Sequence, residues 1–362
     1  MPQKSKFSLD IPASNILDFI FPPNDPIPPN QSVWHDSVDP SNHLTKSQGL
    51  HRIKQLAIAL DNLGIKEQEV VMIFTPNHIC VPIAYMGIVG SKRIFSGANP
   101  IYTVNEVVYQ IENTGAKALF VHPSLLETAI SAAEKTGLPR NRLFQFNDSP
   151  SPENKGVKDW FSILGSQTDA RAYQWPKLDP EHARKTIATI NYSSGTTGLP
   201  KGVMISHANL IANVMQTVYM KDLDMPYNPK SLYRPANRPQ ERWNAFLPLY
   251  HAYGQLFTCL IAPLMGEAVY VMRKFEYAAF LEVIQRYRVT HLQVAPPIIV
   301  MLARRPETKN YDLSSLKYVM CGAAPLSKEL QNEVVSRFGV NITQGWGMCS
   351  LFPGHTQGPA DT

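Results

Sequence analysis

The segment 192–203 constrains the fold most, because it gathers hydroxyls, glycines and one lysine into a single short stretch. Its hydroxyl-bearing and glycine residues are Ser193, Ser194, Gly195, Thr196, Thr197, Gly198 and Gly202. Glycines lack a Cβ and permit positive φ, so the backbone can close around a ligand. Free backbone N–H groups, hydroxyls and a positive charge, here Lys201, are what polyphosphate binding requires. The segment therefore predicts a phosphate-binding loop.

The flanking segments predict a strand over 189–192 and a helix over 208–214, and phosphate loops of α/β folds lie between such elements. A Ser/Gly linker is the alternative. The ordered Leu-Pro-Lys-Gly-Val ending, followed by an apolar run, disfavours a linker. A Walker A loop is excluded, since its lysine precedes Ser or Thr, whereas Lys201 lies between Pro200 and Gly202.

Apolar periodicity along the chain predicts strands that alternate with helices. Helices are predicted over 46–64, 78–90, 103–114 and 278–287, and strands over 70–74, 92–95, 118–121, 269–275, 289–294 and 316–321. This alternation is typical of parallel sheets in an α/β fold. A chain of 362 residues exceeds the ~250–300 residues at which one core stops growing, so we expect two lobes.

The predicted organisation is an irregular N-terminal arm over residues 1–45 followed by two α/β subdomains. The first covers 46–180, and its last part is rich in Ser, Pro, Asn and Lys, which predicts a surface connection. The second covers 181–348 and carries the phosphate loop. Within it, the polar and proline-containing segment 221–242 predicts a mobile excursion.

The composition is that of a globular protein, with 44% hydrophobic and 17% charged residues. The net charge of +5 is small for this length and the basic residues are scattered, so no nucleic-acid partner is expected. Two uncharged runs, 70–91 and 244–266, are long enough to span a membrane. Prolines and polar residues interrupt both, so we interpret them as buried strand–helix pairs and expect no membrane span.

The cysteines indicate an intracellular chain. The four cysteines are Cys80, Cys259, Cys321 and Cys349. They lie far apart with no CxxC pair, which favours reduced thiols and disfavours a zinc site. The sequence ends in 359–362, Pro-Ala-Asp-Thr, which is no peroxisomal signal, so a cytoplasmic location is expected.

The segment 192–203 also resembles the signature of the adenylate-forming (ANL) superfamily, which includes acyl-CoA ligases, luciferases and the adenylation domains of peptide synthetases. In that family the loop holds the β- and γ-phosphates of ATP while a carboxylate attacks the α-phosphate. The resemblance implies an ATP site formed by Ser193, Ser194, Gly195, Thr196, Thr197 and Lys201, with Lys201 also catalytic. The segment 97–103, followed by Glu106, resembles the 4-coumarate–CoA ligase branch.

A second motif, 246–254, contains His251 and Tyr253 after a predicted strand. By type alone, such residues more often belong to a core. The resemblance implies that His251 closes an acyl or aryl pocket, where we count it as catalytic, and that Tyr253 lines the pocket. Adenylation domains for amino acids usually carry Phe-Asp at this turn. The motif therefore favours an aryl or medium apolar carboxylic acid as the substrate.

Three further stretches match the family. The resemblance implies that Gln344, Gly345 and Trp346 bind ATP or AMP, with Trp346 stacked on adenine, and that Ala323, Ala324, Gly345 and Met348 line the acid pocket. An ordinary strand–helix turn is the alternative for the loop with Ala323. Lys274, in Lys-Phe-Glu, is implied to contact CoA, and otherwise it is an unremarkable exposed lysine.

The match is interrupted after Met348. The family continues with Thr and with a Glu that binds Mg²⁺, whereas this chain has Cys349 and Ser350. A thiol donates weakly, and a serine lacks the charge that holds a hard divalent ion. The segment 349–362 resembles nothing in the family, and the family's C-terminal domain with its catalytic lysine does not follow.

These observations predict the N-terminal domain of an adenylate-forming enzyme, with a ligand crevice between two βαβ subdomains at the carboxyl ends of their strands. The expected activity is that of an AMP-forming acyl-CoA ligase using ATP, Mg²⁺ and CoA, impaired by truncation. The alternative is an inactive homologue that binds nucleotide or acyl ligand without turnover. An amino-acid adenylation domain is a third, disfavoured possibility.

Overall fold

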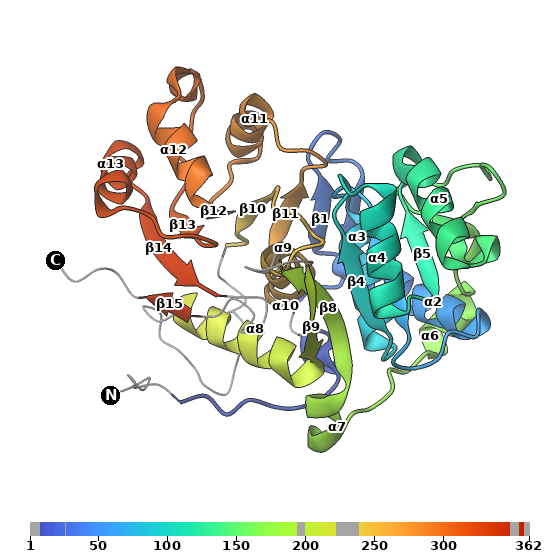
Figure 1. The fold of residues 1–362 in the computed structure, drawn as a ribbon. Coiled ribbons are helices and arrows are strands. Elements are labelled where there is room, and N and C mark those ends of the chain that lie inside the picture. The colour runs from blue at the N-terminus through green and yellow to red at the C-terminus, as the bar shows by residue number, and fades with distance from the viewer. Residues whose placement is uncertain (1–7, 26, 194–199, 222–238, 348–354, 358–362) are drawn as a thin grey trace.

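The computed structural model describes residues 8–25, 27–193, 200–221, 239–347 and 355–357 (Figure 1). These residues form two sheets covered by helices, which confirms the predicted α/β fold. The helices are α1 (Ile16–Ile20), α2 (Lys46–Asn62), α3 (Cys80–Gly90), α4 (Val104–Thr114), α5 (Leu126–Thr136), α6 (Gln167–Ala172), α7 (Pro180–Lys185), α8 (His207–Lys221), α9 (Ala252–Gly254), α10 (Ala262–Met265), α11 (Tyr277–Tyr287), α12 (Pro296–Arg304) and α13 (Lys328–Phe338). A π-helix, Gln255–Ile261, joins α9 to α10.

The first sheet has, within the described ranges, seven strands in the order β7–β6–β5–β3–β4–β8–β9. Their bounds are β3 (Val70–Phe74), β4 (Ile94–Ala98), β5 (Ala118–Val121), β6 (Leu143–Gln145), β7 (Lys158–Asp159), β8 (Ile187–Ser193) and β9 (Lys201–Ser206). Neighbouring strands are parallel except β8 and β9. The predicted strands 70–74 and 118–121 are confirmed residue for residue.

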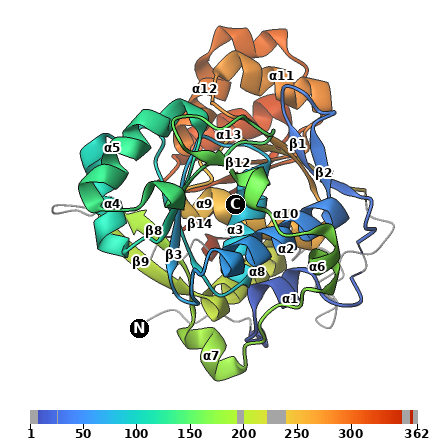
Figure 2. The same cartoon turned by 90° about the vertical axis from the view of Figure 1, so that its right-hand side faces the viewer.

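Strand β3 shows how helices come to cover both faces of this sheet. Side chains alternate between the faces of a strand. Val70, Met72 and Phe74 pack into a cluster with α4 and α5. Val71 and Ile73 pack into the largest core cluster, which includes residues of α2 and α3. Figure 2 shows α4 and α5 on one side of β3, with α2 and α6 on the other.

The second sheet has the order β15–β14–β13–β12–β10–β11–β1–β2 among the described residues. Its strands are β1 (Ser32–Asp36), β2 (His43–Thr45), β10 (Arg242–Ala245), β11 (Ala268–Val271), β12 (His291–Val294), β13 (Tyr318–Cys321), β14 (Asn341–Trp346) and β15 (His355–Gln357). The two edge pairs, β1–β2 and β14–β15, are antiparallel, and the others are parallel. A cluster with residues of α11, α12 and α13 packs on this sheet.

The N-terminal arm was predicted to be irregular, but the structure shows regular elements in it. It contains α1, β1 and β2, and β1 pairs with β11 along Trp34–Asp36. Trp34 is fully buried, and its indole N–H donates to the carbonyl of Thr258 at 3.0 Å. Conversely, β8 and β9 join the first sheet. The strands before residue 46 thus belong to the second sheet, and the first two strands after residue 180 belong to the first sheet. The predicted subdomain boundaries at residues 45 and 180 do not separate the two sheets. Most of the predicted excursion 221–242 lies outside the described residues.

The two uncharged runs are mostly buried. The first run corresponds to β3 and α3, and every residue of α3 is buried. The second run includes the π-helix and α10, whose residues are also all buried. In the part of the chain that the structure describes, no helix combines the length and the apolar character needed to cross a membrane.

An arginine joins the two sheets by ion pairs. The Arg273 guanidinium, just beyond β11, lies 2.9 Å from the carboxylate of Asp36 at the end of β1. It also pairs with Asp148, which follows β6 in the first sheet. Both carboxylates are only 4% exposed, whereas the arginine is 44% exposed. Two buried negative charges therefore depend on one cation.

His207, the first residue of α8, makes stability depend on pH. Its Nδ1 accepts a hydrogen bond from the Ile16 N–H at 3.1 Å, and burial lowers the pKa of the ring to about 3, helped by Lys92. In the unfolded chain the pKa is about 6.5. Between these values the unfolded chain binds the extra proton, so stability falls as the pH falls from about 6.5 to 3. The expected loss is about 1.4 kcal/mol per pH unit in that window.

The His207→Asn variant tests this linkage, because Asn retains an acceptor and does not titrate. We expect the free energy of unfolding in urea to fall less steeply between pH 7 and pH 5 in the variant than in the wild type. Equal pH dependence in the two proteins would contradict the assignment, whatever the difference in stability at pH 7.

Candidate active site

The predicted phosphate loop connects two antiparallel strands, not a strand and a helix. Ser193 is the last residue of β8, and Lys201 faces it as the first residue of β9. Helix α8 begins only after β9. Lys201 is exposed. Ser194, Gly195, Thr196 and Thr197 lie outside the described residues. The sequence reasoning missed β9 because Lys-Gly-Val-Met-Ile-Ser is short and becomes a strand by pairing with β8.

Helix α4 holds the base of this hairpin. The Tyr109 hydroxyl donates to the carbonyl of Pro200 at 2.9 Å, and the Tyr192 hydroxyl donates to Asn113 Oδ1. Burial, and then the neighbouring Tyr109 and Tyr102 hydroxyls, raise the pKa of Tyr192 to about 12, so it remains a protonated donor at neutral pH. Helix α4 thus helps to orient the β8–β9 hairpin, which carries the predicted phosphate loop and is called the phosphate hairpin below.

His251 precedes α9 and caps it. Its Nδ1 accepts from the backbone N–H of Tyr253 at 3.3 Å, so the proton of the neutral ring lies on Nε2. The side chain is exposed, and desolvation by the surrounding protein lowers the imidazole pKa. At neutral pH the ring is therefore an uncharged donor through Nε2.

Tyr253, Gly322 and Gly345 lie close to one another. The Tyr253 hydroxyl donates to the carbonyl of Met320 at 3.0 Å, and its side chain is 7% exposed. A Cβ at Gly322 would lie 3.4 Å from two carbons of the Tyr253 ring and 3.5 Å from the carbonyl oxygen of Gly345. Burial raises the pKa of Tyr253 well above its usual value. The Tyr253 ring and the bare backbone of Gly322 and Gly345 thus form one closely packed wall, in which Tyr253 and Gly322 are buried.

The loop after β13 is strained and is held by Gln344. Ala323 has φ of 71°, a left-handed conformation that costs a residue with a Cβ energy and often marks functional loops. Ala323 and Ala324 are exposed. Gln344 Oε1 accepts from the Leu326 N–H at 3.1 Å, and its Nε2 donates to the Leu326 carbonyl at 3.2 Å and to Gln331 Oε1 at 2.8 Å. The Gln344 amide thus positions this loop.

The remaining predicted residues are placed as follows. Trp346 ends β14, next to Gly345. Met348, Cys349 and Ser350 lie outside the described residues. Lys274 is 81% exposed, and its Nζ lies 3.0 Å from Glu276 Oε1. It lines a surface pocket of about 280 Å³ with Arg273 and Arg286, apart from the tyrosine and glycine wall.

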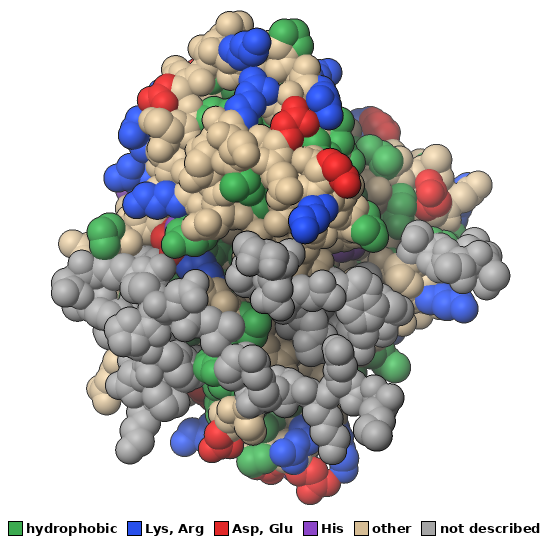
Figure 3. All heavy atoms as spheres, turned by 90° about the vertical axis from the view of Figure 1, so that its left-hand side faces the viewer, with side chains coloured by type: hydrophobic (Ala, Val, Ile, Leu, Met, Phe, Trp, Pro, Cys, Tyr) green, Lys and Arg blue, Asp and Glu red, His purple; other side chains and the backbone are tan. Residues whose placement is uncertain are grey.

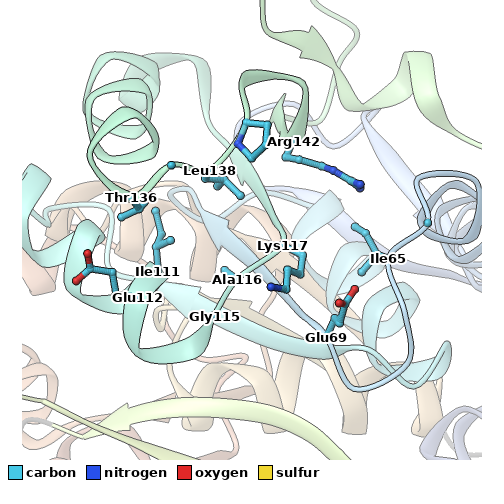
Figure 4. A pocket seen from close by; sticks show the side chains of 13 residues that line it. Ile65, Glu69, Ile111, Glu112, Gly115, Ala116, Lys117, Thr136, Leu138 and Arg142 are labelled. Atoms are coloured by element: carbon cyan, nitrogen blue, oxygen red, sulfur yellow. The ribbon is translucent and has the colours of Figure 1, made fainter.

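Each of these predicted segments lies at the carboxyl end of a strand that has at least one parallel neighbour. The hairpin loop follows β8, the His251 turn follows β10, the Ala323 loop follows β13, and Trp346 ends β14. Ligands of open α/β sheets bind at such ends. A larger pocket, of about 520 Å³, lies at the opposite, amino ends of β3 and β5, where Glu69 and Lys117 line it (Figure 4). It contains none of the predicted site residues.

The turn before His251 is held by hydrogen bonds and close packing from residues that were not predicted from the sequence. Asn77 Nδ2 donates to the carbonyl of Leu247, and its Oδ1 accepts from the N–H of Leu249, both at 2.9 Å. A Cβ at Gly97 of β4 would lie 2.8 Å from the Cα of Tyr250. In the sequence, Gly97 lies two residues after the predicted strand 92–95, and no sequence signal marked Asn77.

Gly254 packs against the other side of this turn. A Gly→Ala substitution there should therefore lower the free energy of unfolding instead of raising it. A Cβ there would lie 2.3 Å from the carbonyl oxygen of Pro248, a backbone atom. Gly→Ala inside a helix ordinarily stabilises by about 0.5–1 kcal/mol. Because Gly254 has helical φ of −64° and no room, Gly254→Ala should instead destabilise by about 1–3 kcal/mol. Urea denaturation measures this, and a stabilised variant would refute the packing described.

Metal ligands and charge complete the description of the surface. In the described ranges, no group of three His, Cys, Asp or Glu side chains gathers that could hold a metal ion. On the face shown in Figure 3, basic side chains are interspersed with acidic and uncharged ones. This distribution accords with the modest net charge of +5.

Comparisons with known proteins identify the family of this chain. The sequence profile described as "AMP-binding enzyme" matches residues 28–360. The match extends past Cys349, where the sequence predicted the end of the family resemblance. Acyl-CoA ligase azaF of Aspergillus niger is 32% identical over 94% of this chain and 62% of its own length. 4-Coumarate–CoA ligase 3 of Arabidopsis thaliana is 35% identical over 83% of this chain and 50% of its own length. The chain thus spans half to three fifths of these relatives.

Solved structures show the same fold. A red-emitting luciferase from Phrixothrix hirtus superposes with a TM-score of 0.80 over 97% of this chain and 63% of its own, at 23% identity. The anthranilate CoA ligase AuaEII, in complex with anthranoyl-AMP, gives a TM-score of 0.76 over 98% of this chain and 64% of its own, also at 23% identity. With a family profile that matches most of its length, this chain belongs to the AMP-binding enzyme family.

Proposed function

We propose that this chain carries the nucleotide and acid sites of an AMP-forming acyl-CoA ligase for an aryl or medium apolar carboxylic acid. The observation that carries the proposal is the packing of the Tyr253 ring against the bare backbone of Gly322 beside Gly345, at the carboxyl ends of the strands. A site bordered by one ring and bare backbone would suit a planar or apolar group. The relatives over most of the chain include an acyl-CoA ligase, a phenylacetyl-CoA ligase and a 4-coumarate–CoA ligase by name.

The proposed reaction has two steps. An oxygen of the acid's carboxylate attacks the α-phosphorus of ATP, the bond to pyrophosphate breaks, and acyl-AMP forms. The thiol of CoA then attacks the acyl carbon, AMP leaves, and the thiol proton is released. Such catalysis depends on positioning and on neutralising the charge of the phosphates.

Each site residue has a proposed part in these steps. Lys201, exposed beside Ser193 at the base of the hairpin, would offset phosphate charge. His251, neutral with its proton on Nε2, would donate to the acid or its adenylate without repelling the lysine. Lys274 would meet CoA at its surface pocket. Bound Mg²⁺ would offset the charge of the phosphates, and we assign it no protein ligand, because the described site residues offer no carboxylate.

The experiment is ATP–pyrophosphate exchange with a panel of acids on this chain. Phenylacetate, 4-coumarate and a medium-chain fatty acid are compared with amino acids and with a mixture that lacks any acid. Exchange that depends on an aryl or apolar acid supports the proposal. Exchange with amino acids alone would assign the chain to amino-acid adenylation instead.

A second candidate, a homologue that binds ligands without turnover, is favoured by one observation. Cys349 and Ser350 replace the Thr and Glu of the family pattern, and a serine is a poor substitute for a carboxylate on Mg²⁺. Retained ATP binding, measured by calorimetry, together with no exchange for any acid would support this candidate and exclude the ligase.

We also propose an intracellular location. Cys80, Cys259 and Cys321 are buried free thiols, which suits a reducing compartment. Fractionation of the cells that produce the chain tests this, and recovery from the secreted fraction would contradict it.

A further inference from the structure

We propose that two buried amides, Asn191 and Gln255, are positioning residues that couple the phosphate hairpin to the turn bearing His251. The inference rests on the proposed function, because the proposed function assigns ATP to the hairpin and the acid to the turn. It predicts that ATP and the acid each strengthen binding of the other, and that this pair of side chains transmits part of the effect.

The two amides form a reciprocal pair, and Asn191 Oδ1 also accepts from the Thr189 hydroxyl at 3.4 Å. Asn191 Nδ2 donates to Gln255 Oε1 at 3.1 Å, and Gln255 Nε2 donates to Asn191 Oδ1 at 3.0 Å. Asn191 is 2% exposed and Gln255 is 0% exposed. A buried amide without partners is costly, so each side chain is held in place by the other.

The pair bridges the two halves of the candidate site. Asn191 lies on β8 in the first sheet, two residues before Ser193, and is opposite Val203 on β9. Gln255 begins the π-helix, and its backbone N–H donates to the carbonyl of His251 at 3.0 Å. Single π turns occur frequently at functional sites. The bridge therefore runs from the strand that enters the phosphate loop to the residue that caps the acid turn.

A second contact from the first sheet reaches the same turn. Asn77 binds the backbone of Leu247 and Leu249, as described above. The turn is thus attached to the first sheet on both sides of His251, by Asn77 before it and by Gln255 after it. A shift of the hairpin on binding ATP would be transmitted to the acid turn through these contacts, and the effect must be reciprocal.

The competing explanation is that the pair only fills the core. The two explanations differ in a double substitution. Replacing both partners of a buried hydrogen-bonded pair by apolar groups of similar shape can be nearly neutral for stability, whereas replacing one leaves the other unsatisfied. Asn191→Leu and Gln255→Met have similar volumes to the originals. The double variant should therefore recover most of the thermal stability lost in each single variant.

The experiment measures coupling by calorimetry on the full chain. The affinity for α,β-methylene-ATP, which cannot be cleaved at the α–β bond, is determined with and without saturating phenylacetate or 4-coumarate. We expect the acid to tighten nucleotide binding by at least about 5-fold, within the usual range of coupling between sites. In the double variant this factor should fall clearly below the wild-type value, although the protein remains folded.

Gln145→Met is the matched control. Gln145 is another buried amide, 2% exposed, and its Nε2 donates to the carbonyls of Pro152 and Val157 at 2.8 and 2.9 Å. It lies on β6, away from the hairpin and the turn. This variant should lose stability and keep the wild-type coupling factor.

The outcomes separate the two proposals. The inference would be overturned if the folded double variant kept the coupling factor of the wild type. It would also be overturned if the wild-type protein bound both nucleotide and acid but showed no coupling between them. Neither result would affect the proposed function. If the wild type bound neither the nucleotide nor either acid, the proposed function would fail, and this inference would fail with it.

Discussion

The Lys201→Ala variant should lose about 10²–10³-fold in the rate of acid-dependent ATP–pyrophosphate exchange, as is usual when one preorganised electrostatic group is removed. Lys201 is exposed at the start of β9, opposite Ser193, with the phosphate loop between them. Tyr109 fixes the neighbouring Pro200 carbonyl, so the lysine backbone is already placed before ligand binds. The loss should appear in the rate at saturating ATP as well as in the apparent affinity.

Lys185→Ala is the control for this substitution. Lys185 is an exposed lysine on α7 that pairs with Glu181 at 2.6 Å, and it precedes β8 at the opposite end of that strand from the loop. It removes the same charge from the surface, and exchange should be unchanged. If the two variants were equally active, Lys201 would not be a phosphate ligand, and the assignment of the hairpin would have to be abandoned.

The Arg273→Met variant should lose about 3–5 kcal/mol of unfolding free energy, the usual result of removing one partner from a buried ion pair. The reason lies in its partners, since the Asp36 and Asp148 carboxyl groups are each 4% exposed and would lose the cation that pairs with them. Because Arg273 is itself 44% exposed, water entering the space it leaves should hold the loss near the lower end of this range. Urea denaturation followed by fluorescence measures the loss.

Arg288→Met is the matched control, since Arg288 pairs with Asp312 at 3.0 Å while both side chains are more than half exposed. Exposed pairs contribute about 0–1 kcal/mol, so this variant should be close to the wild type. Equal losses in the two variants would show that the pairs of Arg273 do not hold the sheets together.

Those parts of the fold that depend on neighbours in sequence could be predicted. Helix α4 follows from local signals, because Thr103 and Glu106 form a capping box and Gly115 ends the helix with φ of 63°. Strands β3 and β5 follow from short apolar runs bounded by polar residues. The family itself could be recognised because the phosphate loop is a contiguous motif, and the profile match over residues 28–360 confirms it.

The parts that depend on distant partners could not be predicted. Nothing local marks Ser-Val-Trp-His-Asp of β1 as a strand, because its pairing partner β11 is far along the chain. The same holds for the contacts of the site. Asn77, Asn191 and Gln255 are ordinary amides in sequence, and only the folded chain brings each to its partner. Gln344 was predicted to bind nucleotide from its motif, and the structure adds the loop contact that fixes its amide.

The place of β1 between β11 and β2 has a consequence for synthesis on the ribosome. The antiparallel partner β2 follows β1 within a few residues, so one edge of β1 can be covered as soon as it emerges. The other edge waits for β11, where Trp34 pairs with Val269. At ~5–20 residues per second, roughly 10–50 s separate the two strands. During that interval the nascent chain presents an unpaired edge with a tryptophan, and mispairing there is the hazard that its biogenesis must avoid.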